Sequence, residues 1–167
     1  AGLVNLEQLI VSENPIYDIS PLAGLSKLRQ LHVHGLYPYQ LQHYLAMDDG
    51  RDPDVVFNGI TDISALAGLT EMRLLRIHLN AISDISPLAN LTNLTHLRIY
   101  DSEIEDISPL ANLDKLVLLW AHNNQIKDIS PLSSMTGMKQ LSLNDNAISD
   151  VTALRAMIEM QHLFLSN

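Results

Sequence analysis

A 22-residue repeat constrains the fold of this 167-residue chain more than any other feature of its sequence. The segment Asp-Ile-Ser-Pro-Leu and two variants of it start at Asp18, Asp62, Asp84, Asp106, Asp128 and Asp150. These starting points are 44, 22, 22, 22 and 22 residues apart. A single unit of this length cannot bury its own apolar side, so we expect the units to stack into a solenoid.

Within one unit the residues follow LxxLxLxxNxIxDISPLxxLxx, counted from positions 6, 28, 50, 72, 94, 116, 138 and 160. The alternating leucines predict a short strand with one buried side, and the asparagine predicts a turn. The Ser-Pro pair predicts a single helical turn with serine as N-cap and proline in the first helical position. The predicted N-caps are Ser20, Ser86, Ser108 and Ser130. The prediction is an α/β leucine-rich-repeat solenoid, with a parallel sheet on the concave face and short 3-10 or helical turns on the convex face.

The 44-residue gap after Asp18 is interpreted as a degenerate repeat at about residues 28–49, because the pattern resumes at Asp62 in register. Residues 28–71 would then contain two repeats, with strands near Leu31–Val33 and Pro53–Val55. The part of the degenerate repeat that follows its strand, Tyr37–Met47, is predicted to be a short helix that begins at Pro38.

Composition excludes several classes of function. Ten Lys plus Arg against nineteen Asp plus Glu give a net charge of −9, which disfavours nucleic acid or an anionic membrane as partner. The longest apolar run, Leu116 to Ala121, is far shorter than the roughly 20 residues needed to cross a bilayer, so we expect no membrane insertion. The chain has no cysteine for disulfides or thiolate metal sites. Because no nucleophile elbow, phosphate loop or catalytic carboxylate pair occurs, we expect a noncatalytic protein without a cofactor.

The segment DISPLANLTNL, from Asp84 to Leu94, resembles the internalin type of bacterial leucine-rich repeat, and the resemblance covers essentially the whole chain. It implies a binding scaffold that is extracellular or on a bacterial cell surface. The chain departs from that family in having no helical cap before Leu3 and no immunoglobulin-like domain after the last repeat. We therefore expect residues 1–167 to form one solenoid of about seven to eight repeats, a fragment of a longer polypeptide that lacks caps.

The recurring aspartates and methionines are interpreted as scaffold. Each aspartate of the repeat lies where a carboxylate accepts hydrogen bonds at the start of the helical turn. All six methionines occupy leucine positions, which favours core packing over a soft-metal site. They are Met47, Met72, Met135, Met138, Met157 and Met160.

Histidines behave differently, because six of the seven lie at the third, fifth and seventh positions of the repeat, which point outward from the predicted strands. Tryptophan, tyrosine and arginine are the residues most enriched in binding hot spots, and they occur at the same positions of the repeat. We predict that three adjacent repeats and the last one bind a protein or glycan partner. The predicted contact residues are Leu74, Arg76, His78, His96, Arg98, Tyr100, Leu118, Trp120, His122 and Phe164.

Two other functions stay open at this point. In the first, the histidine-rich face captures a metal ion or haem, with His32, His34, His78 and His122 as candidate ligands, although no compact motif such as HExxH is present. In the second, the chain is an intracellular scaffold, against which the Asp-Ile-Ser-Pro-Leu repeat argues. The acidic run Asp48 to Asp54 lacks the spacing of an EF-hand, so we interpret it as a solvated loop.

The outward histidines also predict a response to pH, because an ordinary histidine titrates near ~6.5. We expect these side chains to gain charge between neutral and mildly acidic conditions. Arg76 and Arg98 should oppose that protonation, and Asp54 and Asp101 should favour it.

Overall fold

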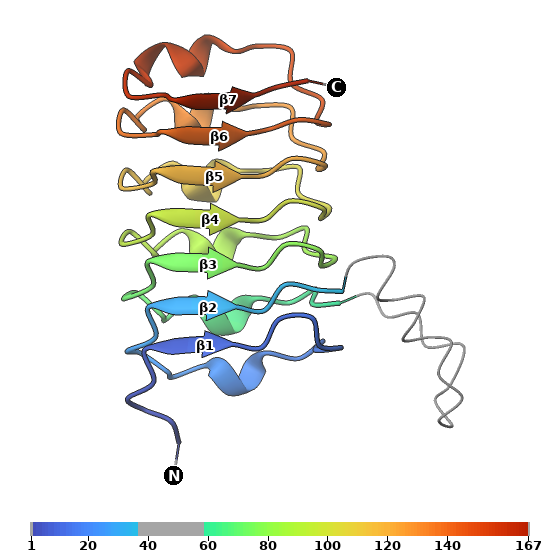
Figure 1. Cartoon of the computed structure of the whole chain (residues 1–167), viewed down its shortest axis with the longest axis vertical. Coiled ribbons are helices and arrows are strands. Elements are labelled where there is room, and N and C mark those ends of the chain that lie inside the picture. The colour runs from blue at the N-terminus through green and yellow to red at the C-terminus, as the bar shows by residue number, and fades with distance from the viewer. Residues whose placement is uncertain (1, 37–58, 167) are drawn as a thin grey trace, which may run out of the picture.

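The computed structural model describes residues 2–36 and 59–166, which form one open parallel sheet backed by short 3-10 helices. Seven three-residue strands follow one another across the sheet in chain order (Figure 1). The strands are β1 (Gln8–Ile10), β2 (Gln30–His32), β3 (Leu74–Arg76), β4 (His96–Arg98), β5 (Leu118–Trp120), β6 (Gln140–Ser142) and β7 (His162–Phe164). The helices are η1 (Ser20–Leu22), η2 (Ser64–Leu66), η3 (Ser86–Leu88), η4 (Ser108–Leu110), η5 (Ser130–Leu132) and η6 (Thr152–Ala156). The predicted leucine-rich-repeat solenoid is confirmed.

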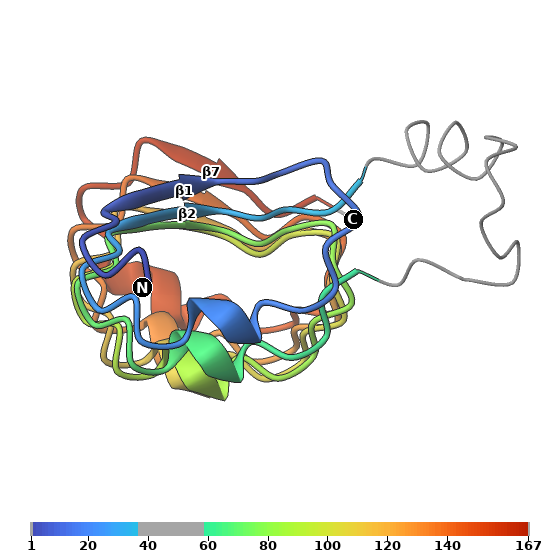
Figure 2. The same ribbon diagram turned by 90° about the horizontal axis from the view of Figure 1, so that it is seen from below.

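The core lies between the sheet and the row of 3-10 helices, which form opposite sides of the coil when it is viewed along its axis (Figure 2). The middle residues of neighbouring strands pair in register, so that Leu75, Leu97 and Leu119 stack behind one another. All three are fully buried, and burial of one such side chain contributes about 1.5–3 kcal/mol. Among the methionines, Met72 and Met138 are also fully buried, as their leucine positions predict.

The N-cap position of each 3-10 helix holds an isoleucine or a valine, and the aspartate before it accepts the backbone N–H of the first helical residue. Asp106 Oδ1 accepts the backbone N–H of Ser108 at 2.7 Å, and the Ser108 hydroxyl donates to Asp106 Oδ2 at 2.9 Å. Backbone geometry makes Ser108 the first residue of the helix and Pro109 the second. The prediction of serine N-caps followed by proline in the first position is therefore wrong by one residue, whereas the carboxylate's role is confirmed. These hydrogen bonds lower the pKa of Asp106.

An asparagine ladder closes the turn after the strands. The Asn124 side chain accepts the N–H of Ile104 at 3.0 Å and donates to the carbonyls of Ile99 and Ala121 at 3.0 and 3.1 Å. Asn80 and Asn146 make the equivalent contacts in their repeats. In the repeat of β4 the same position holds Ser102, whose buried hydroxyl has no partner among the described residues.

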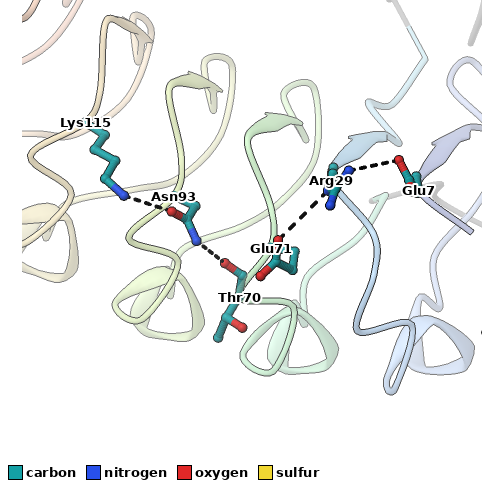
Figure 3. Close-up of polar contacts among 6 residues, drawn as sticks. All are labelled: Glu7, Arg29, Thr70, Glu71, Asn93 and Lys115. Atoms are coloured by element: carbon teal, nitrogen blue, oxygen red, sulfur yellow. Dashed lines mark hydrogen bonds and ion pairs between the residues drawn. The ribbon is translucent and has the colours of Figure 1, made fainter. Parts of the chain in front are cut away.

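Polar contacts between successive repeats also run along the edge that leads into the strands (Figure 3). Arg29 lies between two glutamates, 3.1 Å from Glu7 and 3.9 Å from Glu71. Further along, the Asn93 amide donates to the carbonyl of Thr70 at 3.0 Å and accepts Lys115 Nζ at 2.9 Å. Exposed pairs of this kind contribute little stability each, but they hold carboxylates at the edge and not on the face of the sheet.

The structure corrects the interpretation of residues 28–71 as two stacked repeats. Strand β2 pairs directly with β3, so no strand stands between them in the sheet. The predicted strand over 53–55, the predicted helix over 37–47 and the acidic run of residues 48–54 lie outside the described residues. Two glycines flank that segment and pack on the same loop: a Cβ on Gly35 would lie 1.7 Å from the Leu79 carbonyl oxygen, and one on Gly59 would lie 2.7 Å from Asn80 Oδ1. The described residues on the two sides of that segment, Gly35 and Gly59, therefore both lie against the turn at Leu79 and Asn80.

The two end strands bury less than the inner ones. Leu163 is 43% exposed in β7, and Leu9 of β1 is only partly buried, whereas Leu97 of β4 is fully buried. Each end strand has a neighbour on one side only, which explains this difference. Among the described residues, no helix is both long enough and apolar enough to span a membrane.

Candidate partner-binding surface

The outward side chains at the third, fifth and seventh positions of the repeat make up one surface, which we name the sheet face. Strand register sets two of its rows. Leu74, His96 and Leu118 lie side by side, and Arg76, Arg98 and Trp120 lie side by side two residues later. The nine residues predicted from three adjacent repeats thus come together on β3, β4 and β5 and the turns after them. Phe164, the tenth, is separated from Trp120 by Ser142 of the intervening strand.

The seventh-position side chains form a continuous stack of rings. His34 stacks on His78 with centroids 4.3 Å apart, His78 on Tyr100 at 4.1 Å, and Tyr100 on His122 at 4.3 Å. The planes differ by only 12–22°. The stack follows from the register, because residues in the same position of adjacent parallel strands are about 4.8 Å apart. A four-ring stack of this kind stiffens one margin of the sheet face.

Stacking buries two members of the predicted site. His78 is only 2% exposed and Tyr100 9%, and Leu118 in the third column is 8% exposed. A partner resting on this surface therefore meets mainly the remaining residues of the predicted set. Those that are half-buried or exposed are Leu74, Arg76, His96, Arg98, Trp120 and His122. Sequence alone placed all nine on one face, but it did not show that the rings cover each other.

Burial lowers the pKa of His78 to about 3, and the positive charges of His34 and Arg98 add to this effect. Its Nδ1 atom has no hydrogen-bond partner among the described residues. The expectation that this histidine gains charge between neutral and mildly acidic pH is therefore wrong. The neutral ring is favoured because a buried imidazolium would lose its hydration without a compensating partner.

Four other histidines on the sheet face shift in the same direction. Burial is the first cause of the lowered pKa of His32, of His34, of His96 and of His122. Arg76 and Arg98 lower the pKa further in the first three, as predicted. Asp101 opposes the shift of the His122 pKa, which is the predicted sign, while Asp54 lies outside the described residues.

The centre of the sheet face is an arginine stacked on the chain's only tryptophan. The Arg98 guanidinium carbon lies 3.9 Å from the centroid of the Trp120 ring, within the range of a cation–π contact. Arg76 pairs with Arg98 across β3 and β4, so two cationic side chains lie on adjacent strands. Tyr100 adds a tilted ring contact to Trp120 at 6.3 Å. This arrangement presents an aromatic surface and two guanidinium groups together.

Ser142 is a contributor that the sequence analysis did not select. Its Oγ lies 3.1 Å from His122 Nδ1, and its side chain is buried beside Trp120 in the register. A hydroxyl and an imidazole at this distance also occur in hydrolases, where a third group orients the histidine. Here the contact fixes the end of the ring stack. The sequence did hold one signal, because Ser142 is a small residue at the fifth position of the repeat that follows the repeat of Trp120.

The metal and haem hypothesis finds little support in the geometry. Face-to-face stacking keeps the ring nitrogens of His34 and His78 in parallel planes, and nitrogen lone pairs that lie in those planes do not converge between them. Tyr100 separates His78 from His122. Within residues 2–36 and 59–166, no group of three His, Cys, Asp or Glu side chains is placed to hold a metal ion.

Comparison with known proteins places this arrangement in a family. A family model described as leucine-rich repeats in two copies matches residues 73–112 and 114–156. The structure of internalin C2 from Listeria monocytogenes is 38% identical, with a TM-score of 0.74 over 98% of this chain and 73% of that one. Internalin F from the same species is 35% identical, with a TM-score of 0.65 over 98% of this chain and 55% of that one.

A leucine-rich-repeat protein of Leptospira interrogans shares the fold, with 18% identity and a TM-score of 0.77 over 99% of this chain and 38% of that one. No curated protein matches the sequence. Three observations point to the same family. They are the 22-residue repeat, the single parallel sheet with its 3-10 helices, and the sequence identity to two internalins. The chain belongs to the internalin-type leucine-rich-repeat proteins.

Proposed function

We propose that this chain is a noncatalytic binding module that holds a protein or glycan partner on its sheet face. We also propose that it acts in adhesion, as part of a protein secreted or displayed on a bacterial cell surface. Leucine-rich-repeat proteins of the internalin type are generally protein-binding modules. The observation that carries the proposal is the half-exposed Trp120 with the Arg98 guanidinium stacked on it. Tryptophan and arginine are the residues most enriched where interfaces hold their binding energy.

The rigidity of the surroundings supports the same function. The four stacked rings and the hydrogen bond between Ser142 and His122 hold the margin of the sheet face in one conformation. Rigid anchors lower the entropy that a protein loses on binding. A partner therefore meets a surface that is formed in advance.

The experiment screens the purified chain against a panel of extracellular proteins and glycans, and then measures affinity for each binder by surface plasmon resonance. Trp120→Ala should weaken binding by about 2 kcal/mol or more, whereas Lys127→Ala, on an exposed side chain away from the sheet face, should change it little. An affinity that is indifferent to Trp120→Ala would place the site elsewhere. Isothermal titration with zinc, copper and haem completes the test, because stoichiometric binding of one of these would favour the ligand-capture alternative.

A further inference from the structure

The sheet face changes in charge between β4 and β5. At the fifth position, β3 and β4 present Arg76 and Arg98, whereas the third, fifth and seventh positions of the repeats of β5, β6 and β7 contain no Asp, Glu, Lys or Arg. Burial lowers the pKa of His122, so this ring is neutral at neutral pH although Asp101 and Asp145 beside it oppose the shift. We name this uncharged part of the sheet face the neutral patch. It is formed by Trp120, His122, Gln140, Ser142, Asn144 and Phe164.

Two aromatic rings lie along the middle row of the neutral patch. Trp120 and Phe164 occupy the same position two strands apart, which corresponds to about 9.6 Å at the usual strand spacing of about 4.8 Å. Phe164 is 52% exposed. The Arg98 guanidinium lies over one side of the half-exposed Trp120 ring, so a ligand reaches that ring from the opposite side or from its edge. Ser142, which lies between the two rings in the register, is small and buried, so no long side chain projects between them.

Uncharged hydrogen-bonding groups border this aromatic row on both sides. Gln140 and Asn144 lie two residues before and two residues after Ser142, which places each about 7 Å from the row. Gln140 is half-buried, and its side-chain amide makes no hydrogen bond with any described residue. Asn144 Oδ1 accepts the backbone N–H and the hydroxyl of Ser166 at 3.0 and 3.2 Å, which holds the Asn144 side chain in place. A carboxamide both donates and accepts hydrogen bonds, so it can pair with the hydroxyl groups of an uncharged ligand.

This combination favours a glycan over an apolar segment of a protein. A sugar ring carries C–H groups on its flat sides and hydroxyl groups around its edge, so it can pack on an aromatic ring while its hydroxyls reach the amides beside that ring. In an extended β-1,4-linked glycan, each sugar advances by nearly one strand spacing of about 4.8 Å, and sugars two residues apart have the same orientation. Trp120 and Phe164, two strands apart, would contact two such sugars. An apolar protein segment would instead cover the Gln140 amide without giving it a partner, which is unfavourable.

We propose that the neutral patch binds an uncharged, extended β-1,4-linked glycan that lies across β5, β6 and β7. Sugar rings pack on Trp120 and Phe164, and hydroxyl groups bond to Gln140 and Asn144. This inference rests on the proposed function, which it narrows to one class of ligand. The probe is cellohexaose, and it is compared with maltohexaose, which contains the same sugar in a wound α-1,4-linked chain. Amide resonances of β5, β6 and β7 report binding to each variant, and the fluorescence of Trp120 reports it in the unmodified chain, which has no other tryptophan.

Cellohexaose should bind with an affinity that stays nearly constant between about 0.1 and about 1 M NaCl, because no ionised group takes part. Maltohexaose should bind at least about tenfold more weakly, because its wound chain cannot follow both rings. Gln140→Leu, which keeps the size of the side chain and removes its amide, should weaken cellohexaose binding by about fivefold. Gln30→Leu makes the same change at the same repeat position in β2, outside the neutral patch, and is the matched control.

Equal affinity for the two hexasaccharides, an affinity that falls with salt, or no effect of Gln140→Leu overturns the inference. An absence of perturbation with about 5 mM cellohexaose also overturns it, since a millimolar affinity is already weak. In each of these cases, binding of a protein from the screening panel that is lost with Trp120→Ala would leave the proposed function intact. Circular dichroism of each variant checks folding, so that a loss of affinity is not a loss of structure.

Discussion

Replacing His78 by phenylalanine should make the stability of the solenoid less dependent on pH. In the folded chain this ring is 2% exposed, its pKa is lowered to about 3, and it stacks between His34 and Tyr100. In the unfolded chain the same group titrates near ~6.5. Between these two values the unfolded chain binds a proton that the folded chain does not, so stability falls as the pH is lowered through this range.

The size of the effect follows from the two pKa values. At about pH 5 the unfolded pKa lies roughly 1.5 units above the pH, and at about 1.4 kcal/mol per unit the protonation of His78 removes about 2 kcal/mol of folding free energy. The loss continues to grow until the pH falls to the folded pKa of about 3. His32, His34, His96 and His122 add to it with the same sign, because the pKa of each is also lowered.

Urea denaturation followed by circular dichroism measures this difference. Between about pH 7.5 and about pH 5, His78→Phe should lose about 2 kcal/mol less stability than the unmodified chain. At neutral pH the variant should be at least as stable, because phenylalanine keeps the ring stack and removes a buried Nδ1 atom without a partner among the described residues. His162→Gln, on an exposed side chain of β7, is the control and should retain the original pH dependence. Parallel pH profiles for His78→Phe and the unmodified chain would refute the reasoning.

Two further predictions concern the scaffold. Ser102→Asn should raise the free energy of unfolding by about 1 kcal/mol, because it completes the asparagine ladder, and Asn124→Ser should lower it by about 2 kcal/mol. Thermal denaturation of both variants checks the pair, and equal midpoints would contradict it. The amides of Leu9 and Leu163 in the end strands should exchange hydrogen faster than that of Leu97, as measured by NMR. Slow exchange throughout the monomer would argue against this.

The sequence by itself determined the architecture of the repeat. Period-2 alternation requires Leu75, Leu97 and Leu119 to share one side of the sheet. The same alternation places Arg76, Arg98 and Trp120 together on the other side. The spacing of residues within one repeat leaves room for one short helical turn, and the six 3-10 helices of the described residues agree with that prediction. These features depend on local geometry that recurs in every unit, so the pattern is strong enough to predict them.

Only the tertiary structure decided how many layers lie between Leu28 and Met72. Those two positions are 44 residues apart, and a segment as long as one repeat returns the pattern to register whether it forms a layer or leaves the solenoid. The repeat pattern depends only on the number of residues along the chain, whereas the pairing of β2 with β3 depends on contacts between the two strands. Burial of His78 and Tyr100 was decided in the same way. Their rings are shielded by neighbours from adjacent strands, and such shielding depends on side-chain conformations that no single repeat determines.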